Sequence, residues 1–131
     1  MKNIIFITLF FINLNLFSQE KTIVKNIEGF YIQGWEYSNF MQIDIENCQY
    51  SNHWTEFTPN LKYNGKPFDF GQIENLEEFY MKVNATLISG ETYGHLGSWK
   101  SKIIINEIIE ISVARKINDF KDDCKLLMRV D

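Results

Sequence analysis

Two segments of alternating polarity, joined by a glycine-rich loop, constrain this chain more than any other feature of its sequence. Tyr80–Ser89 and Ser101–Val113 both alternate apolar and polar side chains with the period of two that a half-buried strand requires. Glu107 falls on the apolar side of the second segment, which predicts a β-bulge near Asn106. On this alternation the apolar face of the second segment carries Ile103, Ile105, Ile109, Ile111 and Val113, and the opposite face carries Ile104 and Ile108.

The segments before this pair continue the β-rich pattern. Thr22–Trp35 and Glu36–Ile45 are rich in aromatic and β-branched residues and predict two antiparallel strands joined near Gly34. His53–Phe57 predicts a short third strand. A loop is expected after it, because the turn residues Pro59, Asn64, Gly65 and Pro67 follow.

Two further segments predict helices. Gln72–Phe79 spaces Ile73, Leu76 and Phe79 three apart among acidic residues, as in a short amphipathic helix. Ala114–Asp131 mixes charged and apolar residues and predicts a short helix plus a pairing strand. Three strands, a short helix and two strands is the order of the OB-fold, whose helix lies between strands 3 and 4. We therefore expect a mainly β protein with a small five-stranded OB-fold-like barrel; a β-sandwich or another small barrel is the alternative.

The start of the chain has the pattern of a cleavable secretory signal peptide. Lys2 supplies a positive charge, residues 4–17 are almost entirely apolar, and Ser18 is a small residue at the expected cleavage point. This apolar run is shorter than the roughly 20 residues that a membrane-spanning helix needs. We expect export to the periplasm or the cell exterior, with removal of residues 1–18. Residues 19–131 would then form a single domain with no membrane span.

Charge and histidine content restrict the expected partners. The chain carries 13 Lys and Arg against 17 Asp and Glu, a formal net charge of −4. Nucleic-acid binding depends on clustered basic side chains that displace counterions, whereas the arginines here are only Arg115 and Arg129. The two histidines, His53 and His95, have no neighbours at metal-ligand spacing. We therefore expect no nucleic acid, metal or cofactor.

Cys48 and Cys124 are the two cysteines of the chain. Export would place them in an oxidising compartment, where a pair of thiols commonly closes, so a disulfide that ties the tail to the body is expected. A metal site and a catalytic thiol are the alternatives. Both lack the close Cys or His spacing that they need.

The loop over residues 90–100, GETYGHLGSWK, holds the strongest candidates for function. In an OB-like barrel this loop and the first hairpin converge at one end, so Glu36 is expected to pair with His95. Such a pair either locks the two connections together, which we favour, or orients His95 for ligand contact or proton transfer. The tryptophans Trp35, Trp54 and Trp99 either pack in the core or at the barrel end, or stack on a sugar or peptide ligand, and we favour the core. The candidate ligand-binding residues are Tyr93, His95, Trp99, Glu36 and Trp35.

A family resemblance involves the same segments. Residues 90–111, GETYGHLGSWKSKIIINEIIEI, resemble the closing part of an uncharacterised family of small exported bacterial proteins. The family's segment G-aromatic-E-x-S-x-F reads GWEYSNF here, over residues 34–40, and Trp54 matches a tryptophan of a middle strand. The family's cysteine soon after that segment is replaced by Ile43–Ile45, and Cys48 comes later. The resemblance implies no chemical activity. It does imply which residues here belong to the family's characteristic set: Gly34, Glu36, Ser38, Tyr93, Gly94, His95, Leu96 and Gly97.

These observations predict an exported binding or interaction module of the bacterial cell envelope, which holds an envelope protein, a peptide or a glycan. No catalytic residues are expected. A purely structural subunit of an envelope assembly is the alternative. A small hydrolase that uses His95, or Cys48 with a histidine, is less favoured because no G-x-S-x-G nucleophile motif is present.

Overall fold

Long strands dominate the structure. It is a computed structural model that describes residues 19–69 and 78–129, with side chains through Lys125. The elements in chain order are β1 (Glu20–Gly34), β2 (Tyr37–Asp44), β3 (Gln49–Tyr63), β4 (Lys66–Pro67), β5 (Glu78–Tyr93), the 3-10 turn η2 (His95–Gly97), β6 (Trp99–Ser112) and the helix α2 (Ile117–Arg129). The prediction of a mainly β protein is confirmed.

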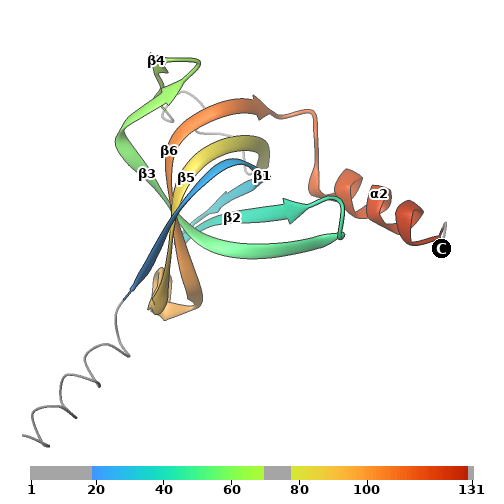
Figure 1. The fold of residues 1–131 in the computed structure, drawn as a ribbon, viewed down its shortest axis with the longest axis horizontal. Coiled ribbons are helices and arrows are strands. Elements are labelled where there is room, and N and C mark those ends of the chain that lie inside the picture. The colour runs from blue at the N-terminus through green and yellow to red at the C-terminus, as the bar shows by residue number, and fades with distance from the viewer. Residues whose placement is uncertain (1–18, 70–77, 130–131) are drawn as a thin grey trace, which may run out of the picture.

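The strands form one mixed sheet whose hydrogen bonds run in a ring. Their order is β2-β1-β5-β6-β3-β4, and β2 also pairs with β3, which joins the two sides of the sheet. β3 and β6 are parallel, and the other pairs are antiparallel. Among the residues that the structure describes, β4 pairs only with the end of β3. In Figure 1 it lies at the opposite end of the molecule from the loop that joins β5 and β6.

The first two strands lie where the sequence predicts them, whereas the third strand is longer than predicted. The first hairpin turns next to Gly34, as predicted. The third strand is much longer than His53–Phe57, because it continues through Pro59 to Tyr63 and turns into β4, which the sequence predicted as loop. Pro59 is tolerated because the ladder with β6 is interrupted between Phe57 and Lys62.

The pairing of β5 with β6 explains both the success and the error of the alternation pattern. Asn84 pairs with Glu107 and Ala85 with Ile105, so Asn106 is the extra residue of a bulge, as predicted. A second register shift follows, between Lys82 and Val83. The bulge at Asn106 reverses the alternation, so that Ile108 pairs with Val83 and is fully buried, opposite to the prediction. The second shift makes Ile109 the extra residue, which is only partly buried, and returns Ile111 to the side of Met81.

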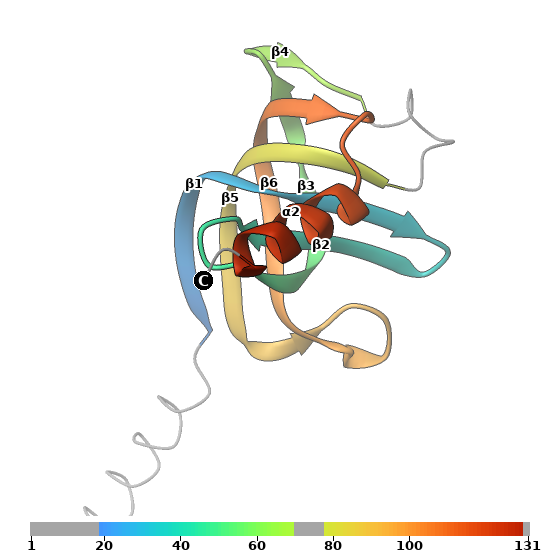
Figure 2. The same cartoon turned by 90° about the vertical axis from the view of Figure 1, so that its right-hand side faces the viewer.

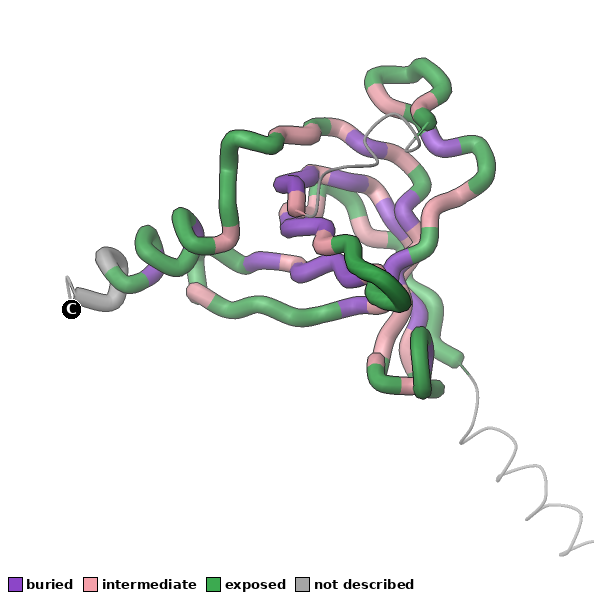
Figure 3. The backbone as a smooth tube through the Cα atoms, turned by 180° about the vertical axis from the view of Figure 1, so that it is seen from behind, coloured by how far each residue is buried: buried purple, intermediate pink, exposed green. Residues whose placement is uncertain are grey.

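The main core lies on one side of these strands. It contains the predicted face of β5, with Met81, Val83 and Ala85 fully buried. Figure 3 shows the buried stretches along the strands and the exposed ones in the connecting loops. Gly29 of β1 faces this core without a side chain, because an added Cβ would lie 2.6 Å from the Phe40 ring and 2.4 Å from the Met41 carbonyl oxygen.

The helix α2 covers a second apolar cluster on the opposite face of the sheet (Figure 2). Phe120 and Cys124 of α2 pack there against residues of β1, β2 and β5: Phe30, Met41, Ile43 and Tyr80. The tail is therefore a helix, and the described residues after β6 contain no pairing strand. The predicted signal peptide lies outside the described residues. So does the predicted helix Gln72–Phe79, except for Glu78 and Phe79, which begin β5.

Cys48 and Cys124 meet in this second cluster as free thiols, not as the expected disulfide. The Cys48 thiol donates to the Ile45 carbonyl oxygen at 3.7 Å. Burial, together with the neighbouring Cys48 thiol, raises the pKa of Cys124 to about 11. Formation of a disulfide requires an oxidant that accepts two electrons, and it proceeds through a thiolate, which the raised pKa of Cys124 disfavours.

Candidate functional site

The first hairpin and the glycine-rich loop meet, as the sequence predicted. The His95 Nε2 and Glu36 Oε2 atoms lie 3.3 Å apart, with both side chains about half exposed. Glu36 and Leu96 adopt positive φ values of 59° and 57°, which turn the two connections tightly enough to present these side chains. An ion pair this exposed contributes at most about 1 kcal/mol to stability, so its main effect is on the position of the two connections.

An aromatic cluster lies beneath the loop. The Trp99 ring contacts the Trp54 ring at a centroid distance of 5.0 Å and the Tyr37 ring at 5.3 Å, both in edge-to-face geometry. Gly94 lies directly over both tryptophans, because an added Cβ would be 2.5 Å from Trp54 and 2.7 Å from Trp99. β2, β3 and β6 thus bring together three aromatic residues that are far apart in the sequence.

Beside this cluster is an open groove of about 600 Å³ with a mixed aromatic and polar lining. Two asparagine amides are connected there to Trp99. The Trp99 Nε1 group donates to Asn39 Oδ1 at 3.0 Å, and Asn39 Nδ2 donates to Asn52 Oδ1 at 2.9 Å. The buried amide of Asn39 thereby holds both Trp99 and Asn52 in place. The groove is lined by Tyr37, Asn39, Asn52, Ser98, Trp99 and Lys100.

The structure brings together some of the predicted site residues and separates others. Glu36, His95 and Trp99 belong to the same region. Trp35, expected in the core, is 93% exposed at the tip of the hairpin, so its assignment to the core is wrong. Trp54 and Trp99 are partly buried in the aromatic cluster.

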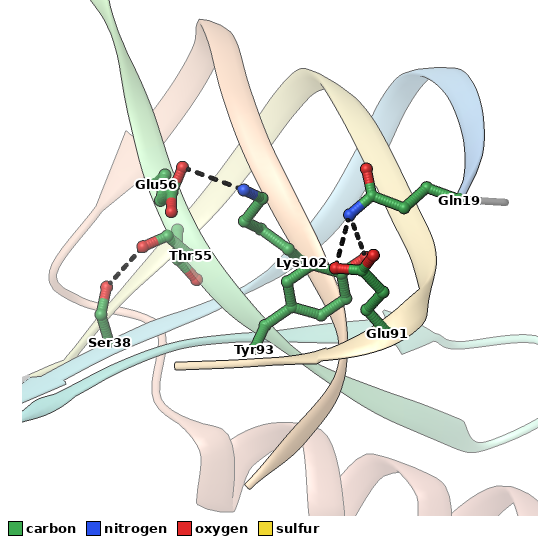
Figure 4. Close-up of polar contacts among 7 residues, drawn as sticks. All are labelled: Gln19, Ser38, Thr55, Glu56, Glu91, Tyr93 and Lys102. Atoms are coloured by element: carbon green, nitrogen blue, oxygen red, sulfur yellow. Dashed lines mark hydrogen bonds and ion pairs between the residues drawn. The ribbon is translucent and has the colours of Figure 1, made fainter. Parts of the chain in front are cut away.

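Tyr93 takes part in a different set of contacts, shown in Figure 4. Its buried ring lies 5.5 Å from Lys102 Nζ, which pairs with Glu56 at 3.5 Å. Gln19 Nε2 donates to the Tyr93 hydroxyl oxygen at 3.3 Å and to Glu91 at 3.0 Å. These contacts connect the start of β1 to β5, β6 and β3, so Tyr93 has a structural role.

Ser38, a member of the resemblance set, connects β2 to β3. Its hydroxyl donates to the Thr55 carbonyl oxygen at 2.9 Å and lies 3.1 Å from the Tyr31 hydroxyl (Figure 4 shows the first contact). Ser38 therefore stabilises the strand pair on which Asn39 and Trp54 stand side by side.

His53 is the second histidine, and it is 5% exposed. Its Nδ1 lies 2.6 Å from Ser101 Oγ, and its Nε2 lies 3.2 Å from Ser51 Oγ and 3.1 Å from Gln42 Oε1. Burial lowers the pKa of His53 below its usual value of 6.5. Cys48 packs against α2 instead, so the structure does not assemble the Cys48–His53 pair of the hydrolase alternative.

The lowered pKa of His53 predicts a pH-dependent stability. The unfolded chain takes up the His53 proton more readily than the folded chain, so the free energy of unfolding should fall as the pH is lowered through 6.5. Urea unfolding between about pH 7.5 and 5.5 measures this slope. His53→Gln removes this contribution, and a slope equal to that of the original protein would contradict the prediction.

Known proteins give no guide to the site. No protein-family model, curated protein or solved structure matches this chain. The resemblance to a family of small exported proteins stays a prediction. The site is therefore interpreted from its own chemistry.

Sequence reasoning missed the groove residues Tyr37, Asn39, Asn52, Ser98 and Lys100. Two signals were available: Tyr37 and Asn39 lie within the GWEYSNF segment, two residues apart on the same face of β2, and Ser98 and Lys100 lie within the loop over residues 90–100. Over residues 19–69 and 78–129, His, Cys, Asp and Glu form no group able to hold a metal ion. In the same part of the chain, no helix is both long and apolar enough to cross a membrane.

Proposed function

We propose that this protein is an exported binding module of the bacterial cell envelope, built on an OB-fold-like barrel. The ring of β1, β2, β3, β6 and β5, with its parallel β3–β6 pair, supports the barrel. In OB-folds the face of strands 2 and 3 and the loops after strands 1 and 4 bind ligands. The corresponding parts here are β2, β3, the hairpin turn at Glu36 and the loop over residues 90–98.

The contact between Glu36 and His95 is the observation that carries this proposal. It joins two connections that are far apart in the sequence, beside a groove that contains aromatic rings, amides and a lysine. Aromatic residues next to a few convergent polar groups in a concave site are typical of ligand-binding pockets. His95 acts in this proposal through position and hydrogen bonding, and the role is one of binding rather than catalysis.

A structural role in an envelope assembly is the second candidate, and one observation favours it. Trp35 is 93% exposed and Leu96 is 88% exposed, on the two connections that the Glu36–His95 contact joins. Large apolar side chains this exposed are suited to burial against a protein partner. The groove therefore supports the binding module, whereas the exposed Trp35 and Leu96, at the tips of the two connections, support the assembly subunit. Variants at the two places can separate these candidates.

The test is capture of material from a bacterial envelope extract by the immobilised protein. Tyr37→Ala changes the groove, whereas a Trp35→Ser, Leu96→Ser double variant changes the tips. Tyr50→Ala is the matched control, because Tyr50 is 60% exposed at the other end of the β2–β3 pair, opposite Ile43. All variants are checked for unchanged urea midpoints.

We expect Tyr37→Ala to lose specific capture and Tyr50→Ala to retain it. Loss in the double tip variant alone would replace the binding module by the assembly subunit. Equal capture by all variants, or none by the original protein, would overturn the proposed function.

A further inference from the structure

The groove beside Trp99 has a lining whose polar groups are mostly neutral. Asn39, Asn52 and Ser98 supply two amides and a hydroxyl, next to the rings of Tyr37 and Trp99. Neutral amides and hydroxyls both donate and accept hydrogen bonds, whereas charged side chains do only one of these. Such a lining fits a ligand covered with groups that also do both, and hydroxyl groups have this property.

Asn52 is the polar group that remains available to a ligand. Its Oδ1 accepts from Asn39, which in turn accepts from Trp99 Nε1, so the orientation of the Asn52 amide is fixed from behind. Asn52 itself is exposed, and no described residue accepts a hydrogen bond from its Nδ2 group. The fold thus fixes the orientation of this Nδ2 group, and the group remains available to donate to water or to a ligand.

Tyr37 supplies the apolar part of the groove. Its side chain is 41% exposed, and its ring is supported by Trp99 at a centroid distance of 5.3 Å. A supported, partly exposed aromatic ring is amphipathic and suits a ligand with both C–H and O–H groups. A sugar ring has this character, because its axial C–H bonds form an apolar face and its hydroxyls surround the edge.

Another ligand class fits the groove less well. A purely apolar ligand would leave Asn52 and Lys100 without hydrogen-bond partners.

From this chemistry we infer that the groove binds a glycan, with a sugar ring stacked on Tyr37 and its hydroxyls bonded to Asn52 and Lys100. This inference rests on the proposed function and names the ligand class of the same site. Lys100 lines the groove, and none of the ion pairs among the described residues involves it, so its ammonium group can donate to a hydroxyl or to a sugar carboxylate. Trp99, beneath the stacked ring, would report binding by a change in its fluorescence.

The test is a fluorescence titration with five probes: laminarin, xylan, alginate, chitotetraose and peptidoglycan glycan strands. We expect at least one probe to bind and to change the tryptophan emission. Tyr37→Ala and Asn52→Ala should each weaken that binding about tenfold or more, while Tyr50→Ala leaves it unchanged. Asn52→Asp is a second variant that keeps the size of the side chain but removes its donor group.

The outcomes separate the glycan from the binding function itself. If none of the five probes binds while capture from the extract still depends on Tyr37, the glycan is wrong and the binding module stands with a different ligand. If binding occurs but neither Tyr37→Ala nor Asn52→Ala weakens it, the assignment to this groove is wrong. If no probe binds and capture from the extract does not depend on Tyr37, both proposals are overturned.

Discussion

Replacing Gly94 with alanine is expected to lower the free energy of unfolding by about 2–5 kcal/mol. Two effects add. Gly94 has φ 75° and ψ −167°, a backbone conformation that only glycine adopts readily. A Cβ there would also lie 2.5 Å from Trp54 and 2.7 Å from Trp99, so both rings would have to move. Urea unfolding followed by tryptophan fluorescence measures the loss.

Gly65→Ala is the matched control for this substitution. Gly65 has an almost identical φ of 74°, but an added Cβ would have no atom within 4 Å. The difference between the two variants therefore measures the crowding against the tryptophans together with the strain that the ψ of −167° adds at Gly94. If Gly94→Ala destabilises no more than Gly65→Ala, the loop does not pack on the Trp54–Trp99 pair.

Oxidation should join Cys48 to Cys124 and stabilise the fold by about 4 kcal/mol, because the bond would close a loop that spans most of the domain. Glutathione disulfide is the oxidant: the two thiols lose their protons and two electrons to it, and two glutathione thiols are released. The raised pKa of Cys124 makes this reaction slow near neutral pH and faster in alkali. Unfolding in urea of the oxidised and reduced forms measures the stabilisation.

Cys48→Ser provides the control, because it retains Cys124 but cannot form the bond within one molecule. Its stability should not change on treatment with the oxidant, apart from attachment of glutathione to Cys124. Two thiols still free to alkylation in the unfolded, oxidised protein would contradict the prediction. So would identical urea midpoints for the oxidised and reduced forms.

The sequence predicted those parts of the fold in which a regular alternation decides burial. Met81, Val83 and Ala85 of β5 follow the period of two without interruption, and all three are fully buried. The same rule failed after Asn106 in β6, because the bulge there reverses the alternation and places Ile108 in the core. The bulge at Asn106 can be inferred from the out-of-phase Glu107, whereas the second one, at Ile109 within a run of apolar residues, leaves no signal.

The candidate site was only partly predictable for a related reason. The meeting of Glu36 and His95 was predicted because the first hairpin and the loop over residues 90–100 converge at one end of the expected OB-like barrel. Asn39 and Asn52 are polar residues on strands, and such residues ordinarily face solvent. Only the β2–β3 pairing, together with Trp99 from a distant strand, makes the buried Asn39 part of a groove.

The ring of paired strands has an entropic consequence for any ligand of the groove. Tyr37, Asn52 and Trp99 stand on β2, β3 and β6, where each is paired with a residue of a neighbouring strand: Gly34, Met41 and Tyr93. Binding to loose loops loses about 0.5–1.5 kcal/mol for each flexible side chain that becomes immobilised. Here that ordering already happens when the chain folds. A ligand that binds in the groove therefore loses mainly its own freedom, and a few weak contacts can suffice to hold it.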